Sequence, residues 1–459
     1  MLQILIFSLL LITSALCDCH SKTSCDSCMT EPDCVWCADP QLELKCIEAD
    51  SEDTCDWNVI DFDNSLTVNE NNPLSPDPDD HQFVQIAPQK ISVTVRPSRP
   101  ISLNFQVAHA KQFPIDLYFL MDLSFSMSAS RENLASLGGQ IIDAIKQRTE
   151  NLATGFGSFV EKNVQPFTSG IAEWNCNPAK QKECVPPYSF YHKASLNDVS
   201  ADQFSKSVLE SPMAGNVDDP EGSLDALMQV MVCGGRIGWR QDSRKIIILS
   251  TDRDYHFAGD GKLAGIFTPN DGKCHLNSTG DGSGYYTHGE MLDYPSVSHI
   301  NSVAQKNNFL VVFAVTDQYQ EAYKALADRI TGSRVARLSS DGSNMIDIVQ
   351  DIYDEITDSI KVMSNGPANI NVTFKTNCEG GIKLGPNSCA EVPLGSPVSF
   401  TADINVDKCL DSPQTVTIFP QGLNENLTVT INTACHCNCI VSGIEATNSG
   451  CPKKMSPSC

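Results

Sequence analysis

Residues 112–360 alternate apolar strands with amphipathic helices, and no other feature of the sequence constrains the fold as much. Mostly apolar runs, each of strand length, occupy 115–121, 156–160, 245–249 and 309–315. Helical periodicity occupies 134–145, 222–232, 321–330 and 345–360. Runs that are apolar throughout are typical of parallel strands buried on both faces. The alternation therefore predicts a doubly wound α/β domain over 112–360.

Patterns of antiparallel β-structure lie on both sides of this domain. Strands are expected before it at 91–95 and 101–105, and after it at 370–374, 398–400, 415–418 and 427–431. A separate piece with two or three strands would be a marginal sheet. We therefore expect the α/β domain to be inserted into one antiparallel β-sandwich with halves 59–111 and 361–435. Two separate β domains are the alternative.

The cysteines and the first residues indicate an oxidising compartment. An apolar run over 2–11 followed by small residues predicts a signal peptide over 1–17. Of 20 cysteines, eight precede residue 56, which predicts a disulfide-rich module over 18–58 and a further cysteine-rich region beginning within 436–459. The spacing Cys25-x2-Cys28 with Cys34-x2-Cys37 would also suit zinc. No later segment is long and apolar enough to span a bilayer, so we expect an extracellular chain, secreted if it ends at Cys459.

The charge of the chain restricts its partners. A formal net charge of −24 argues against binding nucleic acid. An acidic protein that binds an acidic partner needs a cation between the two. The sequons at Asn277, Asn371 and Asn426 predict surface glycosylation, although a sequon can stay unused.

Oxygen-bearing residues gather where the predicted parallel strands end. The strand at 115–121 leads into Asp122, Ser124 and Ser126, and the strand at 245–249 leads into Asp252. Glu221 precedes a helix. Carboxyl ends of strands in open α/β sheets bind ligands, and hydroxyl and carboxylate oxygens suit Mg²⁺. An alternative for Asp122 and the serines alone is capping of the following helix. Three such loops at one edge favour a metal site.

These residues carry a family resemblance. The segment Asp116-Leu-Tyr-Phe-Leu-Met-Asp-Leu-Ser-Phe-Ser-Met127 resembles the inserted von Willebrand factor A-like domain of integrin beta subunits. Further similar segments are 155–161, 219–222, 237–240, 260–266, 269–274 and 291–296. The resemblance runs from about Cys19 to Cys439. It implies a plexin-semaphorin-integrin module at the start and a split hybrid domain around the A-like domain.

The resemblance implies three cation positions. The adhesion site, for Mg²⁺ or Mn²⁺, would be held by Asp122, Ser124, Ser126, Glu221 and, through water, Asp252. A neighbouring Ca²⁺ site would use Glu161, Asn216, Asp218, the carbonyl of Pro220 and Glu221. At the third, inhibitory site only Ser126 and Ser340 match, because Ala129 and Ser130 stand where the family has carboxylates. We expect that third site to be weak.

The resemblance also implies partners and disulfides. Phe125, Asn216 and the loop from Cys176 to Cys184 would contact ligand, and Lys262 would contact an integrin alpha subunit. The implied disulfides are Cys176–Cys184, Cys233–Cys274, Cys378–Cys389, Cys409–Cys435, Cys19–Cys34, Cys28–Cys46, Cys37–Cys55 and Cys25–Cys437. The pairing of Cys439, Cys451 and Cys459 stays open.

The expected function is adhesion without catalysis. With an alpha subunit, the chain would bind acidic side chains of matrix or cell-surface proteins, and movement of the last helix would control affinity. A soluble decoy with the same fold is an alternative. A Mg²⁺-dependent hydrolase with Asp122 as nucleophile is a remote one, because Ser124 stands where such an enzyme typically has a second acid.

Overall fold

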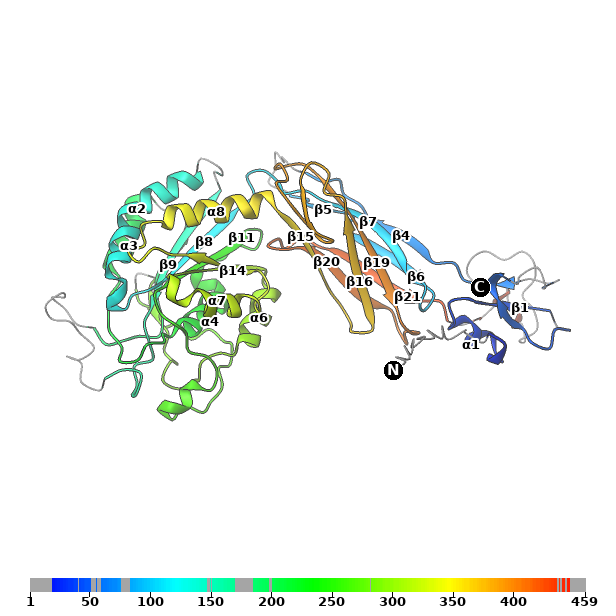
Figure 1. Ribbon diagram of the computed structural model, residues 1–459, viewed down its shortest axis with the longest axis horizontal. Coiled ribbons are helices and arrows are strands. Elements are labelled where there is room, and N and C mark those ends of the chain that lie inside the picture. The colour runs from blue at the N-terminus through cyan, green and yellow to red at the C-terminus, as the bar shows by residue number, and fades with distance from the viewer. Residues whose placement is uncertain are drawn as a thin grey trace, which may run out of the picture.

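The fold is given by a computed structural model that describes residues 19–39, 41–50, 55, 59–75, 83–146, 149, 151–169, 185–197, 200–280, 282–435, 437, 440–441 and 444–445. An α/β domain, a β-sandwich and a small disulfide-rich module follow one another along its length (Figure 1). None of the described helices is long and apolar enough to cross a membrane.

The α/β domain contains a seven-stranded sheet with the order β12-β10-β9-β8-β11-β13-β14. Its strands are β8 (Ile115–Asp122), β9 (Leu152–Phe159), β10 (Tyr191–Asn197), β11 (Arg244–Thr251), β12 (Gly284–Tyr285), β13 (Phe309–Val315) and β14 (Ser333–Arg337). β9, β8, β11, β13 and β14 are parallel. β10 and β12 extend the sheet in antiparallel fashion. The sequence analysis did not predict β10, β12 or β14.

Helices cover both faces of this sheet (Figure 1). One face carries α2 (Ser128–Lys146), α3 (Ala201–Glu210) and α8 (Met345–Asp358). The other carries α4 (Ser223–Val232), α6 (Val297–Lys306) and α7 (Gln320–Ala327), with the short α5 (Gly234–Ile237) after α4. α4 contributes Leu224, Leu227, Met228 and Met231 to the core, as its pattern predicted. The chain has the predicted doubly wound arrangement.

The β-sandwich is built from both sides of the α/β domain. One sheet has the order β17-β18-β15-β20-β21-β6-β4 and the other β16-β19-β7-β5. The strands before the insertion are β4 (Ser65–Glu70), β5 (Ile86–Ala87), β6 (Lys90–Val95) and β7 (Ile101–Val107). Those after it are β15 (Ile360–Asn365), β16 (Ile370–Thr376), β17 (Ile382–Gly385), β18 (Ser388–Ala390), β19 (Val398–Val406), β20 (Gln414–Pro420) and β21 (Leu427–Thr433).

The two halves of the sandwich pair directly with each other. β7 pairs with β19 in antiparallel fashion, and β6 pairs with β21. The pairing of β6 with β21 is parallel, so the expectation of an antiparallel sandwich was wrong for this pair. The two strands come from distant parts of the chain, and no hairpin fixes their relative direction.

The N-terminal module holds α1 (Cys25–Met29) and a small sheet of β1 (Cys34–Cys37), β2 (Cys46–Glu48) and β3 (Val59–Ile60). Arg96, which directly follows β6, connects the N-terminal module to the sandwich. The buried Arg96 guanidinium donates to the carbonyls of Met29 at 3.0 Å and Cys28 at 3.2 Å, and pairs with Asp61 at 2.5 Å. Near the end of the chain lie β22 (Ile440–Val441) and β23 (Ile444–Glu445).

Disulfides account for the described cysteines. The pairs are Cys19–Cys34, Cys25–Cys437, Cys28–Cys46, Cys37–Cys55, Cys233–Cys274, Cys378–Cys389 and Cys409–Cys435. The sulfurs of Cys19, Cys34 and Cys46 lie within 4.8 Å of one another, but each belongs to a disulfide and offers no thiolate. This pairing argues against the zinc alternative. Cys176, Cys184, Cys439, Cys451 and Cys459 lie outside the described residues.

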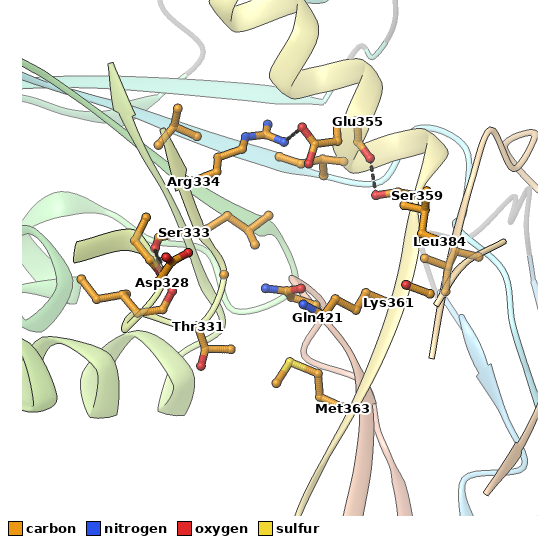
Figure 2. Close-up of a pocket in the computed structure, with 18 of the residues that line it drawn as sticks. Asp328, Thr331, Ser333, Arg334, Glu355, Ser359, Lys361, Met363, Leu384 and Gln421 are labelled. Atoms are coloured by element: carbon orange, nitrogen blue, oxygen red, sulfur yellow. Dashed lines mark hydrogen bonds and ion pairs between the residues drawn. The ribbon is translucent and has the colours of Figure 1, made fainter. Parts of the chain in front are cut away.

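The junction between the α/β domain and the sandwich contains a cavity. A cavity of about 600 Å³ lies between β14, the end of α8, β15 and the β17–β18 hairpin (Figure 2). Arg334 on β14 pairs with Glu355 on α8 beside it. α8 leads through Ser359 directly into β15, so any displacement of α8 along its axis would reach the sandwich.

Candidate metal-binding site

The site begins where β8 and β11 end. Because Met121 pairs in register with Ser250, the next residues of the two parallel strands also lie side by side. Asp122 is fully buried, and its two oxygens accept hydrogen bonds from the Thr251 hydroxyl and from the Ser124 backbone N–H, both at 2.7 Å. The parallel register thus holds the Asp122 carboxylate rigidly at the carboxyl edge of the sheet.

Two further predicted residues, Ser126 and Asp252, are linked to Ser124 through hydroxyl contacts. Ser124 Oγ lies 3.0 Å from Ser126 Oγ, and Ser126 donates to Asp252 Oδ1 at 2.9 Å. The short 3-10 helix η3 (Phe125–Met127) turns both hydroxyls to the same side. Ser126 is exposed, so this side of the cluster is open to solvent.

Glu221 lies just before α4 and reaches the same region from the other side of the loop cluster. Its carboxylate is buried, and its Oε2 atom has no hydrogen-bond partner among the described residues. Burial and the charges of Asp122 and Glu161 raise the pKa of Glu221 well above its usual value. Burial, followed by the charge of Asp252, raises the pKa of Asp122 to about 6. Carboxyls forced together in this way are stabilised by a cation.

A second group of predicted residues lies beside Glu221. Glu161 follows β9 and is buried, and Asp218 and Asn216 come from the loop before α4. Asn216 donates its amide to the carbonyls of Asp218 at 3.2 Å and Pro220 at 3.4 Å. Burial raises the pKa of Glu161 to about 8. The structure therefore brings together all five residues of the predicted neighbouring site.

Three buried carboxylate oxygens in these two groups have no hydrogen-bond partner in the described structure: Glu161 Oε2, Asp218 Oδ1 and Glu221 Oε2. Leaving buried acceptors unpaired is costly, and native proteins rarely do so without an ion or water. The donor set of carboxylates, hydroxyls, an amide and a carbonyl is made of hard oxygen ligands. It fits Mg²⁺ and Ca²⁺ rather than softer metals.

The sequence analysis missed His256, which lies in the loop after β11. Its Nε2 is 2.9 Å from Asp218 Oδ2 and 3.6 Å from Glu161 Oε2, and its Nδ1 is 3.0 Å from Asp260. Burial alone would lower the pKa of His256. Its hydrogen bonds to Asp218 and Asp260 and the charge of Glu161 outweigh burial and raise the pKa to about 9. A lone histidine after a strand gave no usable signal in the sequence.

A buried network that also escaped prediction holds Glu161 in place. Lys162 is fully buried, pairs with Asp225 on α4, and donates to the carbonyls of Gly289 at 2.8 Å and Leu292 at 2.9 Å. Its ammonium lies 4.3 Å from the centre of the Tyr294 ring. The Tyr294 hydroxyl in turn donates to Glu161 Oε1. Lys162 is therefore connected to the carboxylate of the second group through Tyr294.

The region of the predicted third cation has few charged ligands. Ser130 is buried at the start of α2, close to Gly342, and Ala129 is exposed. Ser340 lines a cavity of about 650 Å³ with Asp252 and Asp317. Asp317 is already bound by Arg337, with two contacts of 2.5 and 2.6 Å.

The remaining predicted residues do not belong to either group. Phe125 is half-buried and lines a cavity of about 300 Å³ with Ser124, Ser126, Asn216 and Glu221. Lys262 is exposed on the 3-10 helix η5 (Asp260–Ala264), next to Leu263 and near Phe267, both 71% exposed. The sequon residues Asn277, Asn371 and Asn426 are exposed. The loop from Cys176 to Cys184 lies outside the described residues.

Comparison with known proteins gives a consistent result. Residues 110–360 match the family of the integrin beta chain VWA domain. The chain is 36% identical to integrin beta-PS of Drosophila melanogaster over 363 residues, which cover 78% of this chain and 42% of the relative. It is 33% identical to integrin beta-7 of Mus musculus and 34% identical to integrin beta-1 of Gallus gallus. Each of these two matches covers 92% of this chain and 54% of the relative. The chain thus spans about half the length of these relatives.

Among solved structures, the pilus adhesin SpaC from Lactobacillus rhamnosus GG in its open conformation aligns with a TM-score of 0.33 and 13% identity. That alignment covers 73% of this chain and 45% of the adhesin.

Proposed function

Because this chain belongs to the integrin beta family, we propose that it is the ligand-binding head of a cell-adhesion receptor. Paired with an alpha subunit, it would bind acidic side chains of matrix or cell-surface proteins at Asp122, Ser124, Ser126, Glu221 and Asp252. The observation that carries the proposal is the set of three buried carboxylate oxygens at one edge of the sheet for which the described part of the chain provides no hydrogen-bond donor.

In this proposal the chain's own residues prepare the site. Asp122, Ser124, Ser126 and Glu221 would hold Mg²⁺ or Mn²⁺, and Glu161, Asn216, Asp218, Pro220 and Glu221 would hold Ca²⁺. When bound, the first cation would supply positive charge and an open coordination position for a carboxylate oxygen of the ligand. Thr251 and the Ser124 backbone N–H orient Asp122, and Tyr294 and Lys162 orient Glu161.

Control of affinity would operate through α8. The segment before α8 contributes Ser340 and Asn344 to the cavity beside Asp252. The buried face of α8 packs on the sheet, and its end leads into β15 of the sandwich. The cavity at that end leaves room for α8 to shift (Figure 2). A shift of α8 would therefore couple the proposed Mg²⁺ site to the sandwich.

Two observations bear on the alternatives and on the alpha subunit. Both oxygens of Asp122 accept hydrogen bonds in a fully buried position, which makes this carboxylate a poor nucleophile and disfavours the hydrolase. Lys262 is exposed, and so are the large apolar side chains of Leu263 and Phe267 nearby in the sequence, which supports a contact with an alpha subunit at this segment.

The test is removal of the cation. The chain, together with the alpha chain that co-purifies with it, should attach to an immobilised peptide pool with a fixed Asp in Mg²⁺. EDTA should abolish attachment and renewed Mg²⁺ should restore it, because without a cation the carboxylates of the site repel an acidic ligand. A matched pool with Asn in place of Asp is the control. Attachment that persists in EDTA, or that is equal for the two pools, would contradict the proposed function.

The third cation position gives a second expected result. Calcium at about 10 µM, where high-affinity sites fill, should reduce Mg²⁺-supported attachment by less than about twofold. The physical reason is that Ala129 and Ser130 provide no carboxylate there. Adding one with Ala129→Asp, at an exposed position, should increase the inhibition by Ca²⁺. Strong inhibition of the unmodified chain at this concentration would show that other residues complete the third site.

A further inference from the structure

Arg253 lies between two neighbouring cavities at the carboxyl edge of the seven-stranded sheet, where the proposed Mg²⁺ site is. It follows Asp252 in the loop after β11 and lines both the cavity of about 300 Å³ that contains Ser124, Ser126 and Glu221 and the cavity of about 650 Å³ that contains Ser340. A ligand residue bound at Ser124, Ser126 and Glu221 would therefore lie beside Arg253. The next part of the ligand has space to enter the cavity that contains Ser340.

The proposed Mg²⁺ is surrounded by carboxylates. Asp122, Glu221 and Asp252 bring three formal negative charges to it, and Glu221 is shared with the proposed Ca²⁺ site, so much of the cation charge is already offset when an acidic ligand arrives. Among the described residues that line the smaller cavity, Arg253 is the one with a cationic side chain. Beyond the open coordination position of the proposed Mg²⁺, Arg253 is thus the positive side chain that an acidic ligand meets in this cavity.

The side chain of Arg253 interacts with Tyr319 and with the charges of Asp252 and Asp219, but neither carboxylate forms a close paired contact with it. Its Nε lies 3.6 Å from Asp219 Oδ1, which is too long for a hydrogen bond, and Asp219 is 60% exposed. The other oxygen of Asp219 accepts a hydrogen bond from Tyr319 at 2.8 Å. Arg337, in contrast, is held by both oxygens of Asp317. A guanidinium has five N–H donors, so Arg253 keeps donors for a ligand.

We propose that Arg253 is a specificity-determining residue that binds a second acidic side chain of the ligand, in the cavity beside Ser340. This inference rests on the proposed function, because the first acid must occupy the metal site. The second acid follows within about three residues, since an extended peptide advances only ~3.3 Å per residue. Paired N–H groups of arginine match the two oxygens of a carboxylate, and the hydroxyls of Thr316 and Ser340 line the same cavity.

The experiment selects ligands without knowing them in advance. The full chain with its co-purified alpha chain is exposed in Mg²⁺ to a random peptide library that has one fixed Asp. The unmodified protein should enrich a second Asp or Glu near the fixed one. Arg253→Gln should lower the ratio of two-acid to one-acid binding about tenfold, as expected for a lost charge-assisted hydrogen bond. Arg253→Glu should instead enrich Lys or Arg at that place.

Control variants and outcomes separate the possibilities. Arg337→Gln, which lies in the same cavity but is held by Asp317, should keep the two-acid preference. The reversed selection by Arg253→Glu cannot result from misfolding, which would abolish selection. A two-acid preference that survives Arg253→Gln, one that is lost in Arg337→Gln, or no such preference in the unmodified protein overturns the role of Arg253 and leaves the proposed function standing. Absence of any Mg²⁺-dependent selection overturns both.

Discussion

Replacing Asp122 with alanine should lower Mg²⁺-dependent attachment by about 100-fold or more. Loss of a residue that only supports a metal ligand already weakens metal sites about 10- to 100-fold, and Asp122 would be a direct ligand. Its carboxylate is held in place by Thr251 and Ser124, so no neighbouring group can move in to replace it. Attachment to the Asp-containing peptide pool, measured against Mg²⁺ concentration, checks the prediction.

The same variant should still fold. Asp122 is fully buried, and burial and Asp252 raise its pKa to about 6, so the charged carboxylate is unfavourable without a cation. Added Mg²⁺ should raise the unfolding temperature of the unmodified chain by mass action but not that of Asp122→Ala. Asp143→Ala, at an exposed position on α2, is the matched control and should leave attachment and the Mg²⁺-dependent shift unchanged. Full attachment by Asp122→Ala would refute the assignment of this site.

The central strands and their ends could be predicted because one physical pattern marks them. β8, β11 and β13 are buried on both faces along almost their whole length, so their sequences are mostly apolar. Once they are read as neighbouring parallel strands, Asp122 and Asp252 must lie at the same edge. The strands toward the two edges of the sheet lack this pattern. β14 is mostly half-buried, and β10 mixes polar and apolar residues, so neither resembles a core strand in sequence.

The part of the site that escaped prediction depends on contacts between distant residues. Lys162 and Asp225 are separated in the chain by β10, α3 and their connecting loops and meet only in the folded core. His256 gains its role from Asp218, which comes from the loop before α4, and from Asp260 at the start of η5. A single charged residue in a sequence predicts a solvated side chain, because buried charges are rare unless paired. The partner, and with it the burial, appears only in three dimensions.

Replacing Lys162 with methionine should destabilise the α/β domain by about 3–5 kcal/mol, because it leaves the buried carboxylate of Asp225 without its partner. For a domain of this size, the loss corresponds to a decrease in unfolding temperature of about 10 °C. Urea unfolding, with hydrogen exchange of α4 to locate the effect, measures the change. Burial already raises the pKa of Asp225 against the opposing effect of Lys162. Without the lysine the folded pKa lies higher still, so the deficit should be largest at neutral pH and shrink as pH falls and Asp225 takes up a proton.

Two controls distinguish a buried ion pair from a general loss of charge. Lys193→Met removes a partner of Glu210 at 3.1 Å near the surface and should cost about 1 kcal/mol or less. The double variant Lys162→Met, Asp225→Leu removes both buried charges and should recover much of the stability. It should not recover the position of Glu161, because Tyr294 loses the ammonium that lies over its ring. Restored stability of the double variant with weakened Ca²⁺ binding would therefore separate the pairing of Lys162 with Asp225 from its support of Glu161 through Tyr294. A cost below about 1 kcal/mol for Lys162→Met would contradict both roles.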